Sequence, residues 1–198
     1  MPRVPLVEAE ALGSRLGDLW EFSRTNYGLI PNSFLVLAHR PALADAAARL
    51  ARVIMQEPGT TSIELRWMVG HVTSRAAACR YCSAHTAHFA TELGSILPEK
   101  LDALWEFESS PLFNDAERAA LRVALAAGVT PNAVTDEMFS DLRRHYSDEQ
   151  AVEIVSVIAL FGFFNRWNDT MANEIEQSPL AAARQHLSGT GWYPEDVT

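Results

Sequence analysis

Apolar residues recur at spacings of three and four along most of the chain, and no segment shows a sustained alternation of apolar and polar positions. Spacings of three and four place apolar side chains on one face of a helix, whereas strict alternation is typical of a half-buried strand. The pattern therefore predicts an all-helical fold. Prolines, glycines and capping residues divide the chain into helices expected at about residues 8–27, 33–39, 41–56, 61–94, 99–107, 114–128, 135–145 and 148–174.

Three of these helices begin with a capping-box pattern, in which the N-cap side chain and the side chain three residues later each accept the other's backbone N–H. The pairs are Thr61 with Glu64, Asn114 with Glu117, and Ser147 with Gln150. The pattern gives Glu64 a structural explanation, because a capping role accounts for a glutamate at that position without any chemistry.

No linker, low-complexity tract or fixed-period repeat divides the 198 residues, so we expect one all-helical domain over residues 1–198. Its core should be the helices at about 61–94, and residues from about 179 to 198 should form a C-terminal arm. The run 154–164 is apolar on every face. This indicates a place in the middle of the bundle or at a subunit interface.

Charge and hydropathy exclude several classes of partner. Sixteen basic residues against twenty-five acidic ones give a net charge of -9, which repels nucleic-acid phosphates and anionic membrane surfaces. The longest apolar run is shorter than the roughly 18 residues that a membrane-spanning helix needs. Residues 1–17 lack the basic start and apolar run of a secretory signal. We therefore expect a cytoplasmic protein without nucleic-acid or membrane partners.

Two cysteines and two histidines follow one another at three-residue intervals, namely Cys79, Cys82, His85 and His88. These residue types could together bind zinc. On a helix, however, three such steps bring the first and last side chains to opposite sides, so the four cannot converge on one ion. The sequence also has no second CxxC pair to complete a site. We expect no metal and no other cofactor.

A redox role fits the same spacing better, because Cys79 with Cys82 and Cys82 with His85 each lie within one helical turn. In the first turn of a helix, unpaired amides and the helix dipole lower a thiol pKa from about 8.5 towards neutrality. His85 is then placed to accept the proton of Cys82. The alternative is that both cysteines are small buried apolar residues and that His85 is a buried polar group.

The segment Cys79-Arg-Tyr-Cys82-Ser-Ala-His85 resembles the core motif of the carboxymuconolactone decarboxylase family, in its alkylhydroperoxidase D-like, peroxidase-related branch. The aromatic residue before the second cysteine and the small-residue helix ending at Gly94 belong to the resemblance, as do stretches at 113–119, 134–136, 146–148 and 165–166. It covers about residues 30–170. Together with the usual length of helices, it favours a break in the 61–94 region near residues 76–78.

The resemblance implies an all-helical, alkylhydroperoxidase D-like bundle that assembles as a homotrimer or homohexamer and reduces hydroperoxides in antioxidant defence. It implies that Cys82 attacks the peroxide as a thiolate and becomes a sulfenic acid, which Cys79 resolves to a disulfide. A thioredoxin-like protein or another dithiol would then reduce that disulfide. In this scheme His85 is the proton acceptor.

Two positions differ from the family pattern. The family's histidine commonly lies four residues after the second cysteine, where this chain has Thr86, so His85 is the candidate one residue earlier. The family's proton-relay glutamate commonly lies twelve residues before the first cysteine, where this chain has Trp67. Glu64, one turn earlier on the same face, is the candidate catalytic carboxylate, and His71 is another candidate for the relay.

Two other functions remain open for such a chain. One is a non-peroxidase member of the same fold, such as a lactone decarboxylase-type protein, and the other is a general dithiol–disulfide oxidoreductase that acts on proteins. Decarboxylases of the family do not depend on a CxxC pair. The presence of Cys79 and Cys82 therefore favours the redox branch.

Overall fold

A computed structural model describes residues 2–8, 23 and 28–193, and over these residues the regular structure is helical without strands. The elements are α2 (Asn32–Leu37), α3 (Pro41–Met55), α4 (Ile63–Ala76), α5 (Arg80–Glu92), α6 (Pro98–Asp102), η2 (Leu104–Glu106), α7 (Asp115–Gly128), α8 (Asp136–His145), α9 (Asp148–Met171) and α10 (Gln177–His186). The all-helical prediction is confirmed. The helix expected at 8–27 lies outside the described residues apart from positions 8 and 23.

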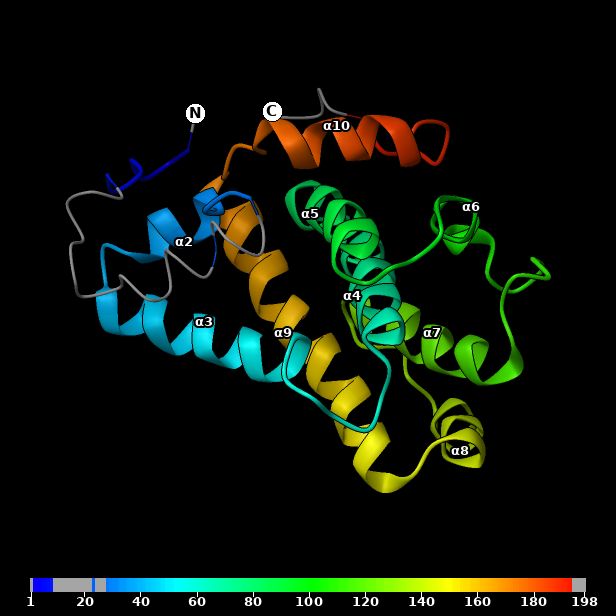
Figure 1. Cartoon of the computed structure of the whole chain (residues 1–198). Coiled ribbons are helices and arrows are strands. Elements are labelled where there is room, and N and C mark those ends of the chain that lie inside the picture. The colour runs from blue at the N-terminus through cyan, green and yellow to red at the C-terminus, as the bar shows by residue number, and fades with distance from the viewer. Residues whose placement is uncertain (1, 9–22, 24–27, 194–198) are drawn as a thin grey trace.

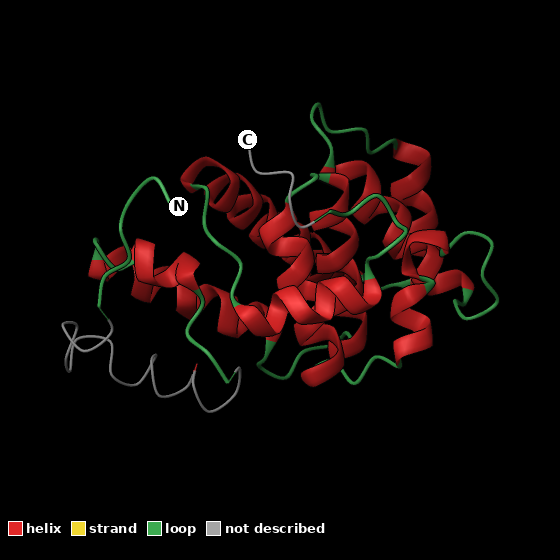
Figure 2. Ribbon diagram, turned by 90° about the horizontal axis from the view of Figure 1, so that it is seen from above, coloured by secondary structure: helices red, strands yellow, loops and turns green. Residues whose placement is uncertain are grey.

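Helix α4 lies at the centre of the bundle and packs against α5, α7 and α9. Helix α3 runs beside α9 on one side, and α8 lies beside α7 on the other (Figure 1). Seen from above, α10 lies across α5 (Figure 2). In the described part of the chain, no helix has the length and apolar character needed to cross a membrane.

The expected break between two helices at 61–94 is confirmed and falls at residues 77–79. Helix α4 ends at Ala76 with Ala77 as its C-cap, and Ala78 adopts a left-handed backbone conformation with φ of 56°. Such a residue turns the chain, because a right-handed helix cannot continue through it. As a result Cys79 becomes the N-cap of α5, and Cys82 lies in its first turn.

Two of the three expected capping boxes are present, those of Asn114 with Glu117 and of Ser147 with Gln150. The third is wrong: Ser62 is the N-cap of α4, and its hydroxyl accepts the Leu65 N–H at 3.1 Å. Thr61 instead donates its hydroxyl to Glu153 Oε2 at 2.7 Å. The contact with α9, ninety-two residues away in the sequence, competes for the side chain that the local pattern assigned to the cap.

Arg66 is 5% exposed and joins the loop before α4 to α9. Its guanidinium donates to Thr61 Oγ1 and to the carbonyls of Ile54 and Glu57, at 3.0, 3.1 and 2.9 Å. Glu153 lies 3.5 Å from Arg66 and also accepts the Thr60 and Thr61 amides, each at 2.8 Å. Burial acts to raise the pKa of Glu153, but these hydrogen bonds and the Arg66 charge hold it below the usual value.

The predicted C-terminal arm at 179–198 begins within helix α10 (Gln177–His186), which packs on α5. Pro179 lies in the first turn of this helix, where the missing N–H has no intrahelical partner to lose. An irregular segment follows the helix. In it, Trp192 is buried and Arg80 Nε donates to the Tyr193 carbonyl at 2.7 Å.

Helix α9 buries one apolar face in the bundle and leaves another exposed. Ile154, Val157 and Phe161 are buried, whereas Val155 and Phe163 are 39% and 43% exposed. Phe139 of α8 and Val152 lie beside this outer face and are 36% and 66% exposed. The uniformly apolar run in the sequence therefore supplies more apolar surface than the described part of one chain covers.

We expect Glu153→Gln to lower the free energy of unfolding by about 1–3 kcal/mol at pH 7, because a charged acceptor is removed from Arg66 and two amides. The folded-state pKa of Glu153 lies below the unfolded one, so its contribution is complete above about pH 4.3 and is lost as the pH falls through the folded-state value. Urea denaturation of wild type and variant should converge at acid pH. The exposed Glu106→Gln is the control, and an equal loss in both variants would contradict the assignment.

We propose that the outer face of α9 contacts a second copy of this chain, in a homotrimer or homohexamer. Sedimentation equilibrium at micromolar concentration should show such an oligomer, and Val155→Glu combined with Phe163→Glu should dissociate it by burying charge at the interface. The control is Val53→Glu combined with Leu50→Glu on the exposed face of α3. A monomeric wild-type protein would refute the proposal.

Candidate functional site

Cys79 is the N-cap of α5, directly after the turn that follows α4, and Cys82 lies in the first turn of α5. Both side chains are buried, with exposures of 0% for Cys79 and 2% for Cys82. They are free thiols. The Cys82 N–H donates to Cys79 Sγ at 3.4 Å, so the Cys79 sulfur acts as the helix cap. An N-terminal cap faces unpaired N–H groups and the positive end of the helix dipole, which favour negative charge on sulfur.

Helix α9 supplies an amide to the Cys82 sulfur. Asn168 Nδ2 donates to Cys82 Sγ at 3.2 Å, and Asn168 Oδ1 accepts from Asn173 Nδ2 at 2.7 Å. The second hydrogen bond fixes which end of the Asn168 amide faces the cysteine. Because an N–H donor interacts more strongly with a charged acceptor than with a neutral one, Asn168 is placed to stabilise negative charge on the Cys82 sulfur during a reaction.

Cys79 is held in its protonated form. A hydrogen bond to Cys82, burial and the nearby Asp169 carboxylate raise the pKa of Cys79 well above the usual value. Two thiols in different environments can take different roles, with one poised to attack and the other kept as a thiol. The environments favour Cys82 as the attacking sulfur and Cys79 as the resolving one, which is the order that the family resemblance implies.

His85 forms an ion pair with Glu176, a residue from the segment between α9 and α10. His85 Nε2 lies 2.8 Å from Glu176 Oε2, and Nδ1 lies 2.9 Å from the Tyr81 carbonyl oxygen. A carbonyl and a carboxylate only accept hydrogen bonds, so each ring nitrogen of His85 lies close to an acceptor oxygen.

Several hydrogen-bond donors hold the Glu176 carboxylate in place. Its Oε1 accepts the Tyr81 hydroxyl at 2.9 Å and the Asn32 backbone N–H. Burial acts to raise the pKa of Glu176, but the His85 charge and these hydrogen bonds hold it below the usual value. The Tyr81 ring also stacks on the His85 ring, with 4.0 Å between centroids.

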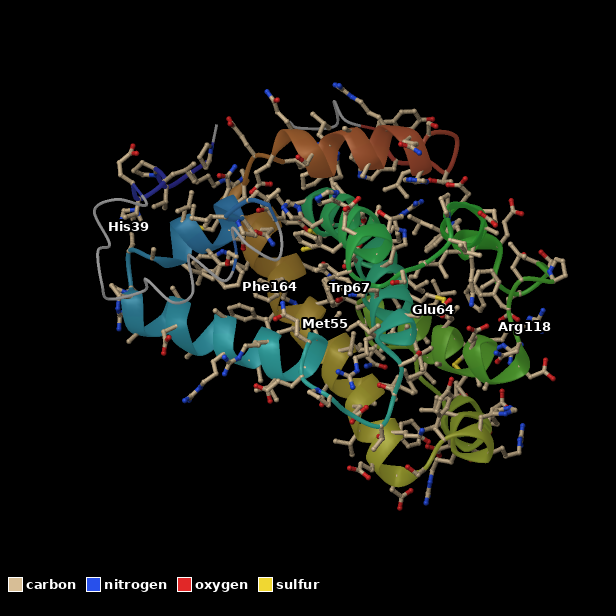
Figure 3. All side chains as sticks on the ribbon, viewed as in Figure 1. His39, Met55, Glu64, Trp67, Arg118 and Phe164 are labelled. Carbon is tan, nitrogen blue, oxygen red and sulfur yellow. The ribbon has the colours of Figure 1, made fainter. Side chains whose placement is uncertain are left out.

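A cavity of about 90 Å³ opens beside the Cys82 sulfur. One water needs about 10–15 Å³ of such volume, so the cavity holds a molecule the size of several waters. Its lining is mostly apolar and consists of Pro31, Ser33, Phe34, Ala51, Met55, Trp67, Tyr81, Cys82, His85, Thr86, Phe89, Leu160, Phe161, Phe164 and Asn168. Figure 3 shows Met55 of α3, Trp67 of α4 and Phe164 of α9 around the space between these helices.

Trp67, at the position of the family's relay glutamate, forms part of the cavity wall and packs on Phe89 and Phe161, with centroids 5.6 and 6.5 Å apart. Gly70, one turn further along α4, has no side chain to collide with the Phe161 ring, which a Cβ there would approach to 2.4 Å. The α4 wall of the cavity is therefore apolar, and the carboxylate beside His85 comes from Glu176 instead.

Glu64, the carboxylate candidate from the sequence, is not among the residues around the Cys82 cavity. Glu64, which is labelled in Figure 3, lies 2.8 Å from Lys100 Nζ. Lys100 Nζ also contacts Glu117 at 2.7 Å. Burial acts to lower the pKa of Lys100, but the two carboxylates raise it above the usual value. These contacts join α4, α6 and α7, which is a structural role for Glu64.

His71, the other relay candidate, is fully buried on α4. Burial, with the charges of Arg75 and His186, lowers its pKa to about 3, so it is neutral at ordinary pH. Its Nδ1 lies 2.9 Å from Thr86 Oγ1, which donates to the Cys82 carbonyl at 2.7 Å. His71 thus supports the backbone of α5, whereas the sequence suggested it as a member of the relay.

The site contains some residues that the sequence pattern predicted and others that it did not predict. Cys82 and His85 line one cavity, as their spacing on one helical face suggested. Asn168, Asp169 and Glu176 were missed, and no local pattern marks them. Among the described residues, no group of three or more His, Cys, Asp and Glu side chains is arranged to hold a metal ion.

Comparison with solved structures finds the same fold in two kinds of protein. The debrominase Bmp8, crystallised as a cysteine-to-alanine variant with 2,3,4-tribromopyrrole, superposes with a TM-score of 0.86 at 35% identity, covering 92% of this chain and 96% of Bmp8. A peroxidase-related protein with an alkylhydroperoxidase AhpD core, from Ralstonia eutropha JMP134, superposes with a TM-score of 0.79 at 27% identity, covering 90% and 94%.

In sequence, the chain is 33% identical over 108 residues to the uncharacterized protein YnjA of Escherichia coli K12, which is 54% of this chain and 58% of YnjA. No family model matches the sequence. The structural likeness to Bmp8 nevertheless covers almost the whole of both chains at 35% identity. The chain belongs to the carboxymuconolactone decarboxylase family, in the alkylhydroperoxidase D-like branch whose fold is shared by peroxidase-related proteins and the debrominase Bmp8.

Proposed function

We propose that this protein is a dithiol-dependent reductase that removes an electrophilic atom from a small apolar substrate, with a hydroperoxide as the leading substrate and antioxidant defence as its role. One observation carries the proposal. The Cys82 sulfur accepts an amide N–H and faces a small apolar cavity, while Cys79 behind it keeps its proton. A nucleophilic sulfur and its resolving thiol require two such different environments.

In the first step the Cys82 thiolate attacks the terminal oxygen of the hydroperoxide. The S–O bond forms, the O–O bond breaks, Cys82 is oxidised to a sulfenic acid and the alkoxide takes up a proton to leave as an alcohol. His85, whose Nε2 lies 2.8 Å from the Glu176 carboxylate and which lines the same cavity, is the proton donor. The nearby carboxylate is the reason for giving His85 a donor role in place of the acceptor role expected from its spacing.

In the second step the Cys79 sulfur attacks the Cys82 sulfenic acid. The S–S bond forms and the hydroxyl leaves as water, so the two thiols have together supplied two electrons. A dithiol able to reach the buried pair then reduces the disulfide by exchange and becomes a disulfide itself. The protein returns to the form with two free thiols.

The walls of the cavity favour a small-molecule substrate over a protein disulfide. Cys82 is 2% exposed, and the space beside it holds a molecule the size of several waters. A protein disulfide attached to a folded backbone is too bulky for that space. The geometry therefore supports a peroxidase-like reaction better than general dithiol–disulfide exchange on protein substrates.

Reduction of a halogenated aromatic is the second candidate, because Bmp8 has the same fold and because six aromatic residues line the cavity, namely Phe34, Trp67, Tyr81, Phe89, Phe161 and Phe164. Here the Cys82 thiolate would take the halogen from a ring carbon, and the carbon would take a proton from His85. Cys79 would then displace halide from the sulfenyl halide to give the same disulfide. The thiol chemistry is shared, and only the electrophilic atom differs.

Turnover of cumene hydroperoxide and of 2,3,4-tribromopyrrole, each with dithiothreitol as electron donor, tests the proposal and ranks the two substrates. Cys82→Ser should abolish turnover of either substrate, because no nucleophile remains. With dithiothreitol left out, Cys79→Ser should perform one turnover and leave a sulfenic acid on Cys82 that dimedone traps. Full activity in Cys82→Ser would refute the proposal.

Filling the cavity should exclude substrate without altering the thiols. Ala51→Phe places a ring in the space beside Cys82, and we expect kcat/KM for the preferred substrate to fall by about 10-fold or more, which is about 1.4 kcal/mol. Ala46→Phe, on the exposed face of the same helix, is the matched control. Equal kcat/KM values in the two variants would show that substrate does not enter this cavity.

Glu176→Gln removes the carboxylate charge beside His85 but leaves an amide oxygen for Tyr81 and Asn32. We expect kcat/KM, measured as a pH–rate profile, to fall about 10-fold or more near neutral pH, because the proton donor loses its charged partner. Asp102→Asn, which breaks the His186–Asp102 pair of 2.7 Å outside the cavity, is the matched control. A profile identical to that of the wild type would exclude His85 as the donor.

A further inference from the structure

Seven side chains with N–H, O–H or S–H groups line the cavity beside Cys82 in the described part of the chain. Five of them take part in a hydrogen bond or ion pair with another part of the protein, namely Tyr81, Cys82, His85, Thr86 and Asn168. The other two side chains are those of Ser33 and Trp67. Ser33 Oγ and Trp67 Nε1 are buried, and neither has a hydrogen-bond partner among the described residues.

An unpaired polar group inside a protein needs an explanation, because burial removes its water without supplying a replacement. Ser33 and Trp67 are only 3% and 4% exposed. Both residues belong to the wall of the mostly apolar cavity that contains the Cys82 sulfur. A molecule bound in this cavity can pair with the two groups if it carries hydrogen-bonding atoms of its own. The unpaired groups therefore suit the recognition of a ligand.

Ser33 is held on the side of the cavity where His85 lies. Its backbone N–H donates to the Tyr81 hydroxyl at 3.1 Å, and the Tyr81 ring stacks on the His85 ring with 4.0 Å between centroids. The Tyr81 hydroxyl also donates to Glu176 Oε1 at 2.9 Å, which fixes Ser33 relative to the His85–Glu176 pair. A serine hydroxyl both donates and accepts hydrogen bonds. Ser33 can therefore pair with either kind of group on a ligand.

Trp67 forms part of the α4 wall, and other aromatic side chains hold its ring in place. The ring packs on Phe89 and Phe161, with centroids 5.6 and 6.5 Å apart. An indole N–H donates a hydrogen bond and cannot accept one. A ligand that pairs with Trp67 must therefore offer an acceptor atom, such as an oxygen.

We infer that Ser33 and Trp67 are specificity-determining residues, whose hydroxyl and indole N–H bind the polar end of the substrate in the Cys82 cavity. The inference rests on the proposed function and adds to it the chemical class that the cavity selects. That class is a small, otherwise apolar molecule with an oxygen acceptor at or beside its electrophilic atom. The buried, unpaired state of both groups and their place in the wall carry the inference.

The two candidate substrates differ in how well they pair with these groups. Both oxygens of a hydroperoxide accept hydrogen bonds and its O–H donates, so it can pair with Ser33 and with Trp67. The N–H of 2,3,4-tribromopyrrole can donate to Ser33, but the nitrogen lone pair belongs to the aromatic ring and accepts nothing. A polar group left unpaired by a ligand lowers the selectivity of a site for that ligand. The wall therefore favours the hydroperoxide.

The kinetic test compares wild type, Ser33→Ala and Trp67→Phe, with cumene hydroperoxide and 2,3,4-tribromopyrrole as substrates and dithiothreitol as electron donor. Ser33→Ala should lower kcat/KM for both substrates by about 3–10-fold, the size expected for one neutral hydrogen bond. Trp67→Phe keeps an aromatic ring and should lower the ratio of kcat/KM for hydroperoxide to that for pyrrole by a similar factor. Ser74→Ala is the control, since this buried hydroxyl donates to the Gly70 carbonyl and lies outside the cavity.

A binding measurement tests the same groups without turnover. The probes are 2-phenyl-2-propanol and tert-butylbenzene, which differ only by a hydroxyl in place of a methyl group, and calorimetry gives the Kd of each. In Ser33→Ala and in Trp67→Phe, the Kd of the alcohol should rise about 3–10-fold relative to that of the hydrocarbon. Urea denaturation should find Ser33→Ala at least as stable as the wild type, because a hydroxyl without a partner contributes no hydrogen bond to the folded state.

Unchanged Kd ratios in both variants would overturn the inference, because the two groups would then make no contact with the ligand. Equal slowing of both substrates by Trp67→Phe would overturn the role of the indole N–H, since loss of shape alone explains that result. A clear loss of stability in Ser33→Ala would show that the hydroxyl has a structural partner and would contradict its role. If the wild type turns over neither substrate, the proposed function fails, while the binding measurement still decides on Ser33 and Trp67.

Discussion

The site depends on one turn of backbone. Ala78, in the left-handed conformation, ends α4 and lets Cys79 cap α5, so that both thiols meet the N-terminal end of a helix. A continuous helix over the same residues would bury the CxxC pair in its interior, where the amides are already bonded to carbonyls and the dipole has no free end. The Cys82 N–H to Cys79 Sγ hydrogen bond follows from this turn. The two sulfurs therefore occupy different positions at the N-terminus of α5, one at the cap and one in the first turn.

Around this turn, helices that are distant in the sequence supply the walls of the site. Trp67 makes the α4 wall apolar, and Glu176 brings a carboxylate to His85 from beyond α9. The cavity beside Cys82 is small and mostly apolar, and the polar side chains that a bound substrate meets there include those of His85 and Asn168. Asp169, the residue after Asn168, lines a second cavity that shares no lining residue with the first.

Much of the fold could be predicted because its signals are local. Helical spacing, two capping boxes and the break near 76–78 are determined by residues that are close together in the sequence. The CxxC–His segment is also local, and it identifies the site. Contacts across the bundle could not be predicted this way. Thr61 bonds to Glu153 on α9 instead of capping α4, and Glu64 pairs with Lys100. Asn168 contacts Cys82, which lies 86 residues earlier in the sequence, and Glu176 contacts Tyr81 and His85, which lie 95 and 91 residues earlier. No helical spacing in the sequence predicts contacts over such separations. A proline such as Pro179 is compatible with the first turn of a helix as well as with the end of one, so its position did not predict α10.

The central claim is that Cys82 and Cys79 form one redox pair with distinct roles. The most direct measurement is intact-mass and peptide-mapping spectrometry of the reduced protein after one equivalent of its preferred oxidant. The account predicts a product lighter by two hydrogens, with a single disulfide joining Cys79 to Cys82 and both free thiols restored by dithiothreitol. Two cysteines that remain available to alkylation in the presence of excess oxidant, or Cys82 oxidised to a sulfinic acid without any bridge, would contradict it.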